Sequence, residues 1–101
     1  MKPISHGKNN KLRQSAKGKD CTFNVVGHCN YDSETVVLCH IDSEFKGMSM
    51  KSPDFFGGFG CSGCHAWLDQ HLGTEEDRLF YSLRALCRTQ KQWFDEGVIK
   101  T

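Results

Sequence analysis

The cysteines and histidines of this chain are spaced so that they could bind metal ions or take part in catalysis. Two cysteines form a tight turn, Cys61-Ser62-Gly63-Cys64, and an upstream pair, Cys21 and Cys29, is separated by seven residues. A Cys-x-x-Cys turn lets two thiolates meet one metal ion, and a second pair would complete the four soft ligands of a closed, tetrahedral zinc site. The upstream spacing is wider than in a regular knuckle, so the assignment of that pair rests partly on elimination. We therefore predict Cys21, Cys29, Cys61 and Cys64 as ligands of a structural zinc ion.

Other uses of these cysteines stay open. His28 lies inside the upstream pair and could replace either of its members as a ligand, or some thiols could be buried without a metal. Residues 1–19 contain no apolar segment of the kind found in secretion signals, and thiols in the cytoplasm stay reduced, so metal binding is favoured over disulfides. We expect the remaining cysteines, Cys39 and Cys87, to be small core residues.

A histidine and a carboxylate follow the tight pair. His65 comes directly after Cys64, and Asp69 is four residues further on, so both fall on one face of a short helix and can chelate one divalent cation. His40 lies in a predicted strand, and Asp54 lies in the loop after it. Phosphodiester hydrolysis needs a base for water, a group that orients the base, and a cation at the leaving oxygen. Imidazole suits the role of base because it titrates near neutrality.

Each of these residues also has an ordinary structural interpretation. His40 could be a strand histidine with satisfied hydrogen bonds, and His65 could replace a cysteine at the structural zinc. Asp69 could be a carboxylate on the helix surface. The other three histidines are expected to be bystanders: His6, His28 and His71.

Local patterns predict the elements that would hold these residues. Residues 35–41 are β-branched and apolar and predict a strand, whereas glycines within 42–60 indicate a loop or an irregular hairpin. Residues 61–72 are predicted to form the cysteine turn followed by a short helix that ends at Gly73. Thr74 is a good N-cap for a second helix that ends at Gly97. The core face of that helix is expected to contain its apolar residues: Leu79, Phe80, Leu83, Leu86, Cys87, Trp93 and Phe94.

The composition indicates one small α+β domain with a thin core. The chain has 101 residues, of which 38% are hydrophobic, so a metal staple would help it to fold. Net charge is +1, but residues 1–19 carry lysines and arginine without any acidic residue. We expect residues 1–19 to form a flexible basic arm, either solvated or bound to phosphates, with at most a helical turn near Leu12–Ala16. Residues 20–101 are expected to form the zinc-binding domain. The sequence has no run of about 18 apolar residues, the length that a membrane-spanning helix needs, so we expect a cytoplasmic protein.

Several segments within 20–101 occur together in one known family. They are Cys29-Asn30, Glu34-Thr35, Val37-Leu38, His40-Ile41, Pro53-Asp54, Cys61-Ser62, Cys64-His65, Asp69, Arg88-Thr89-Gln90, Trp93 and Glu96-Gly97-Val98-Ile99-Lys100. In this combination they resemble the YbcO-like family of phage and prophage nucleases. The resemblance implies a zinc-stapled ββα-metal domain of the His-Asn-His type with an additional C-terminal helix.

The resemblance also implies roles for single residues. His40 would be the general base, and Asp54, in the position of the middle Asn, would orient it. His65 would bind a catalytic cation such as Mg²⁺, Mn²⁺ or Zn²⁺, with Asp69 as the second ligand. The sequence departs from the pattern at Asp54, which cannot donate an amide hydrogen bond, and at Cys39, where many relatives of this type have an acidic residue or histidine. Three further residues are spare candidates for a missing ligand: Asp42, Glu44 and His71.

These observations lead to one main hypothesis and two alternatives. The main one is a phage or prophage DNA endonuclease in the bacterial cytoplasm, active in recombination or DNA processing, with a host recombination protein as a candidate partner. One alternative is a non-catalytic zinc module that binds nucleic acid through residues 1–19. The other is a zinc-stapled adaptor that contacts a protein through Phe55 and Phe56. The sequence does not determine the oligomeric state.

Overall fold

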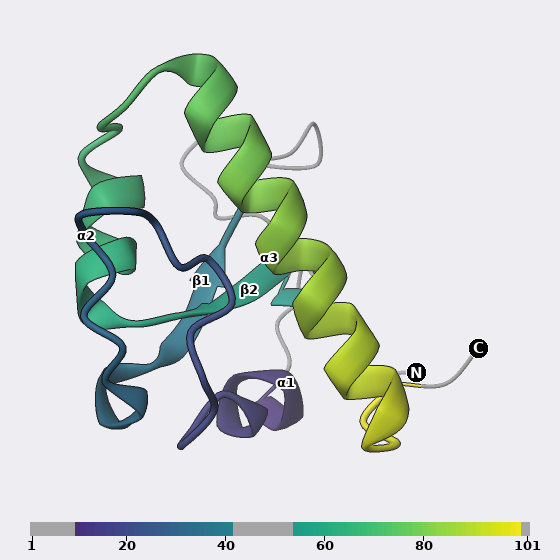
Figure 1. Cartoon of the computed structure of the whole chain (residues 1–101). Coiled ribbons are helices and arrows are strands. Elements are labelled where there is room, and N and C mark those ends of the chain that lie inside the picture. The colour runs from purple at the N-terminus through teal and green to yellow at the C-terminus, as the bar shows by residue number, and fades with distance from the viewer. Residues whose placement is uncertain (1–9, 42–53, 100–101) are drawn as a thin grey trace.

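The fold is a small α+β arrangement of a two-stranded sheet and three helices (Figure 1). It is known from a computed structural model that describes residues 10–41 and 54–99. Asp42 and Glu44, two of the spare candidates for a missing ligand, lie outside the described residues. The elements, in chain order, are α1 (Asn10–Ser15), η1 (Ser33–Thr35), β1 (Val37–His40), η2 (Asp54–Phe56), β2 (Gly57–Gly60), α2 (Ser62–Asp69) and α3 (Glu75–Asp95).

The sheet is an antiparallel pair in which Val37 faces Gly60 and His40 faces Gly57. The predicted strand at 35–41 is therefore confirmed as β1, and the glycine-rich stretch supplies β2. Glycine in β2 lets a helix approach closely. A Cβ atom at Gly58 would lie 2.8 Å from the Cβ of Ala85, so any side chain there would push α3 off the sheet.

Helix α3 begins where the sequence predicted it to begin. The Thr74 hydroxyl accepts a hydrogen bond from the backbone N–H of Asp77, and the Asp77 carboxylate accepts one from the N–H of Thr74. This reciprocal capping box satisfies two N–H groups that no helix carbonyl can reach. The acidic residues in the first turn also suit the positive end of the helix dipole.

The face that α3 turns to the core differs from the expected one. The buried residues of the helix are Ala85, Thr89 and Trp93. Most of the predicted core residues are instead exposed: Leu79, Phe80, Leu83, Cys87 and Phe94. The prediction was wrong because apolar side chains occupy two sides of this helix, and the narrow, glycine-rich sheet contacts the side with small residues.

Two threonines close the free edge of β2. The backbone N–H of Phe59 donates to Thr89 Oγ1 over 3.0 Å, and the Phe59 carbonyl accepts from the N–H of Thr22 over 2.7 Å. The Thr22 hydroxyl also donates to the Phe59 carbonyl and lies 3.1 Å from Thr89 Oγ1. Both threonines are buried, so these bonds supply partners that water could not provide.

The N-terminal region is more ordered than expected. Leu12 and Ala16 are buried in the core, and the indole N–H of Trp93 donates to Ser15 Oγ over 2.6 Å. Residues 10–16 are therefore packed against the domain, which differs from the expectation of a flexible arm up to residue 19. The part of that arm before residue 10 lies outside the described residues. Among the helices of the described part of the chain, none is long and apolar enough to cross a membrane.

Replacement of Thr89 by valine tests the edge network. The change keeps the shape of the side chain but leaves the N–H of Phe59 without this acceptor, so we expect the free energy of unfolding to fall by about 1–3 kcal/mol. Urea unfolding followed by circular dichroism measures it. Ser82→Ala on the same helix is the control and should change stability by less than about 0.5 kcal/mol. Equal stability of Thr89→Val and the parent would contradict the role of the network.

Candidate functional site

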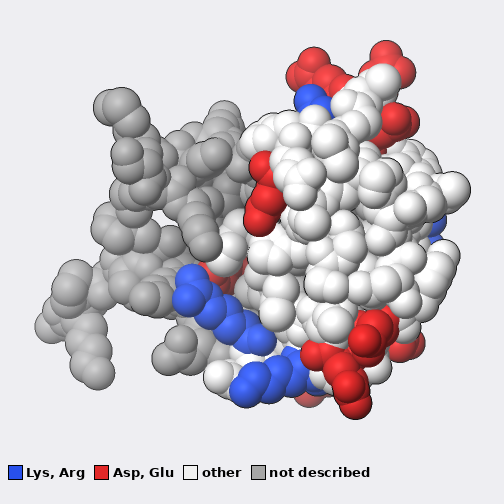
Figure 2. All heavy atoms as spheres, turned by 90° about the vertical axis from the view of Figure 1, so that its left-hand side faces the viewer, with Lys and Arg blue, Asp and Glu red and all other residues white. Residues whose placement is uncertain are grey.

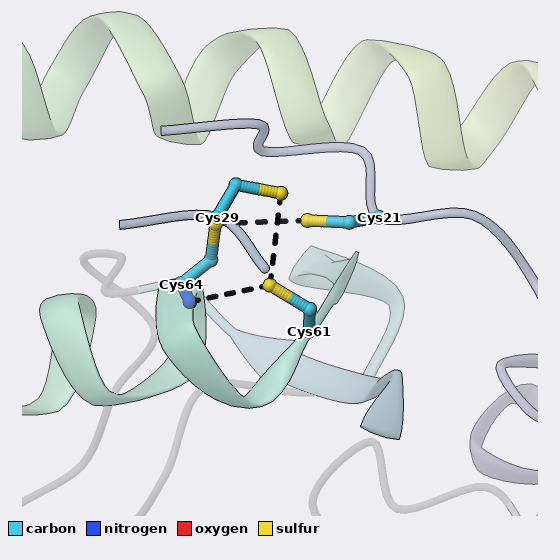
Figure 3. A group of neighbouring side chains, drawn as sticks. All are labelled: Cys21, Cys29, Cys61 and Cys64. Carbon is cyan, nitrogen blue, oxygen red and sulfur yellow. Dashed lines mark hydrogen bonds between the residues drawn. The ribbon is translucent and has the colours of Figure 1, made fainter. Parts of the chain in front are cut away.

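The four predicted zinc ligands converge on one point. The sulfur atoms of Cys21, Cys29, Cys61 and Cys64 all lie within 4.8 Å of one another (Figure 3). The Cys21 and Cys64 sulfurs are 3.6 Å apart, and those of Cys29 and Cys61 are 3.7 Å apart. A tetrahedral zinc ion with Zn–S bonds of about 2.3 Å requires sulfur separations of about 3.8 Å. The group therefore fits a metal such as zinc, as the cysteine spacing predicted.

Backbone N–H groups around this group donate hydrogen bonds to the sulfur atoms. Cys61 Sγ accepts from the N–H groups of Asn30 and Cys64 over 3.4 Å each, and Cys64 Sγ accepts from the N–H of Val25 over 3.4 Å. Cys21 Sγ accepts from the N–H of Asn24 over 3.5 Å. Hydrogen bonds to the charged form favour thiolate, which is the form that binds metal.

The thiols share protons because they are crowded. The hydrogen bond between Cys21 and Cys64 lowers the pKa of Cys21 to about 4, and the same bond, with burial, raises the pKa of Cys64. Burial also raises the pKa of Cys29. A metal ion would displace these shared protons. Cys39 differs, because burial raises its pKa to about 12, so it stays a neutral core thiol as expected.

Gly63 lets the two cysteine segments meet. A Cβ atom at this position would lie 2.0 Å from the carbonyl oxygen of His28, so the turn before Cys64 can pass the upstream segment only without a side chain. In the part of the chain that the structure describes, the metal-binding group contains neither His28 nor His65. The two interpretations in which a histidine replaces one of the four cysteines are thus not favoured.

Replacement of one of the four cysteines tests whether the group binds zinc. Cys61→Ser should lose most of the bound zinc and unfold at a lower temperature, because metal affinity contributes directly to folding of such sites. Zinc per chain is measured by atomic emission, and melting by circular dichroism with and without EDTA. Cys87→Ser is the matched control for zinc content, since Cys87 is an exposed cysteine on α3 outside the four-cysteine group. Equal zinc content in Cys61→Ser and the control would contradict the assignment.

A second group joins β1, η2 and α1. His40 Nε2 lies 2.5 Å from Asp54 Oδ1, and Asp54 is only 1% exposed. Arg13 donates to the same carboxylate through Nε over 3.0 Å and Nη2 over 3.2 Å. A buried carboxylate needs charged or hydrogen-bonding partners, and this two-bond contact with a guanidinium is a strong one. His40 and Asp54 were predicted to act together, and they are in contact.

Sequence reasoning missed Arg13. It lies in the stretch that was assigned to a basic arm, where its charge indicated contact with phosphates. The available signal was weak: Leu12 and Ala16 are four residues apart, which is helical spacing, and this could have placed Arg13 on a packed helix. The structure gives its guanidinium a partner inside the protein instead.

His65 and Asp69 lie together on α2, away from the buried side of that helix. Their nearest side-chain atoms are 3.4 Å apart, and the side chains are 43% and 70% exposed. Cys64 and Trp67 form the buried side. Within residues 10–41 and 54–99, no group of three or more candidate ligands unites this pair with His40 and Asp54. The spare candidate His71 is exposed, and its carbonyl accepts from Arg78.

Two arginines of α3, Arg78 and Arg88, donate hydrogen bonds to neighbouring segments of the chain. Arg78 Nη1 donates to the carbonyls of His71, Leu72 and Gly73 at the end of α2. Arg88 Nη1 donates to the Thr22 carbonyl and to Asn24 Oδ1, next to the cysteine group. These contacts hold the loops between elements in place.

Arg13→Ala tests whether this residue fixes Asp54. Loss of both hydrogen bonds leaves a buried carboxylate with less support, so we expect stability to fall by about 1–3 kcal/mol. The imidazole N–H proton of His40 should also exchange faster with water in NMR spectra. Arg13→Lys should recover only part of both properties, because an amine cannot make the two-bond contact. Gln14→Ala, at an exposed neighbour on α1, is the control, and identical His40 spectra in all variants would argue against the role.

The geometry defines a class: a small α+β domain in which a four-cysteine group holds a hairpin and helix, with a histidine at the end of the first strand. Comparison with known proteins agrees. The family described as "Putative nuclease YbcO" matches residues 10–98. Relatives of that same name from Escherichia coli K12 and Enterobacteria phage 82 are each 37% identical over 92 residues, which is 88% of this chain and 96% of theirs. The chain belongs to the YbcO family.

A solved structure has the same fold. It is described as that of a "putative bacteriophage protein" from Escherichia coli K-12, is 34% identical, and superposes with a TM-score of 0.71. The match covers 86% of this chain and all of the solved one. The family resemblance predicted from short segments is therefore confirmed, and it extends into α1, which the segment comparison had left out.

Proposed function

We propose that this chain is a metal-dependent endonuclease that hydrolyses phosphodiester bonds of DNA. The observation that carries the proposal is the contact between His40 and the buried Asp54 in a member of a family named for nuclease activity. The order β1, β2, α2 supports it, because a hairpin followed by a helix is the arrangement expected for His-Asn-His nucleases. In this proposal the four-cysteine group binds a structural zinc ion and takes no part in the reaction.

In this mechanism His40 is the general base. Its Nε2 atom is hydrogen-bonded to Asp54, so Nδ1 is the ring nitrogen that would take a proton from the attacking water. Asp54 orients the ring and stabilises the positive charge that the ring gains. Arg13 holds Asp54 in the position that this requires. An aspartate can fill the role of the middle Asn because orientation of the ring needs only an acceptor.

His65 and Asp69 would hold the catalytic cation. They lie one helical turn apart on α2 with their side chains 3.4 Å from each other, and both are open to solvent, as an exchangeable site requires. A divalent cation bound there would supply charge stabilisation for the phosphate and the leaving oxygen. Mg²⁺, Mn²⁺ and Zn²⁺ are the candidates for this second metal.

Charge on the surface favours a polyanionic substrate near α1. Figure 2 shows a few lysine and arginine side chains low on the face that carries α2, at the level where α1 lies in Figure 1. Acidic side chains lie beside them, and much of the face is uncharged. Lys11 and Lys17 are exposed on and after α1. Lysines in this position can release counterions from DNA and guide it towards His40. A relative from a phage supports a setting in phage biology. Action in DNA processing in the bacterial cytoplasm, with a host recombination protein as partner, is part of the proposal.

One competing function is a zinc-stapled module that binds nucleic acid without cutting it. In the described part of the chain, His65 and Asp69 form a pair rather than a larger ligand group, and this favours the competing function. The two functions differ in whether a divalent cation produces cleavage.

His40→Ala tests the proposed mechanism. Supercoiled plasmid is incubated with the zinc-loaded protein and Mg²⁺, Mn²⁺, Zn²⁺ or Ni²⁺, and nicked product is measured on gels. Loss of the general base should slow nicking by about 100-fold or more, while affinity for DNA is retained. His28→Ala, at an exposed histidine elsewhere, should cut like the parent.

Two outcomes would reject the proposal. If His40→Ala cuts as fast as the parent, His40 is not the base. If the parent binds DNA but no cation produces nicks, the non-catalytic function is the correct one.

A further inference from the structure

An exposed apolar surface runs along α3 on the side that faces away from the sheet. Its large side chains are Leu79, Phe80, Leu83 and Phe94, which are 65%, 60%, 62% and 51% exposed. Single exposed apolar residues are ordinary on protein surfaces, but a continuous set on one element marks a contact site. The buried residues Ala85, Thr89 and Trp93 account for the other side of the helix and leave this side without a role in the core.

The spacing of this surface fits a second helix. We define the outer stripe as Phe80, Leu83, Cys87, Gln90 and Phe94, which follow one another at steps of three and four residues. Gln90 is its polar, half-buried member, and its side-chain amide donates to the Phe55 carbonyl. Side chains at this spacing form the seam between two paired helices, because 3.5 residues per repeat keep them facing a partner. Along α3 the stripe extends about 21 Å at 1.5 Å per residue, long enough for a specific helix pair.

Charges beside the stripe favour a second copy of this chain. Asp77, Arg84 and Lys91 follow one another at intervals of seven residues along one flank. In an antiparallel pair of identical helices this flank faces itself in reverse order, so Asp77 of each copy meets the partner's Lys91. Within one copy Lys91 Nζ pairs with Asp95 over 2.6 Å, so the partner's Asp77 would share this ammonium group with Asp95. A parallel pair would not bring these opposite charges together.

Arg84 lies at the middle of the flank, where it would come near its own counterpart. Its guanidinium is folded back over the rings of Phe80 and Tyr81, with its central carbon 5.0 Å from each ring centroid. The charge is thus stacked on its own helix. Stacking leaves the positive charge in place, so repulsion between the two arginines opposes pairing and the two Asp77–Lys91 contacts must offset it.

We propose that the outer stripe is the contact surface of a two-fold homodimer in which the α3 helices pair antiparallel. Phe80, Leu83 and Cys87 form the apolar centre of the contact, and the two Asp77–Lys91 pairs flank it. The proposal is independent of the nuclease assignment, since it uses neither His40 nor the cysteine group.

The first experiment measures the mass of the zinc-loaded full chain by sedimentation equilibrium. The parent should approach twice its 11.5 kDa as concentration rises. Leu83→Glu should weaken association by about 30-fold or more, because it places a charge at the centre of the seam. Val26→Glu is the matched control, since Val26 is 80% exposed outside α3, and it should associate like the parent. Unchanged zinc content and circular dichroism show that both variants are folded.

The second experiment tests the orientation. Lys91→Glu places a carboxylate opposite the partner's Asp77 and should weaken the antiparallel dimer about fivefold at low salt. A single-chain mass for the parent at every concentration would overturn the dimer, and so would equal association of Leu83→Glu and Val26→Glu. A dimer that Lys91→Glu leaves unchanged would overturn the antiparallel arrangement.

Discussion

Four sulfur atoms that lie within 4.8 Å of one another are the constraint on which the rest of this fold depends. They connect the segment at 21–29 to the corner between β2 and α2. Cys61 has two tasks there, because its sulfur belongs to the group and also accepts from the N–H of Cys64, which makes it the N-cap of α2. A two-stranded sheet is marginal by itself, so a metal at this corner would supply stability that the thin core lacks.

The second constraint is the buried charge of Asp54. A carboxylate that is 1% exposed would destabilise the fold without partners, and it obtains them from two directions, His40 on β1 and Arg13 on α1. Replacing such a group by an apolar residue often stabilises a protein, so stability alone is a weak reason for its presence. A buried, oriented acceptor beside a histidine is more easily explained by chemistry that uses the histidine.

The sequence predicted those features that depend on local chemistry. The Cys-x-x-Cys turn indicated the metal group because two thiolates at that spacing can reach one ion, and Thr74 indicated the start of α3 because its hydroxyl can cap a helix. The sequence predicted α1 as at most a helical turn near Leu12–Ala16, because a helix of six residues has too few apolar positions to show a clear period. The contact between Arg13 and Asp54 joins residues 41 positions apart, and no local pattern contains it.

The error on α3 has a different physical origin. Its apolar residues were assigned to one core face, but a helix has room for two apolar strips, and periodicity does not say which strip meets the sheet. The glycines of β2 decide this, since Gly58 admits only a small neighbour, and Ala85 provides one. The larger side chains, Phe80 and Leu83, therefore remain on the outside. The same close packing that fixes the helix on the sheet thus produces the exposed apolar stripe on its other side.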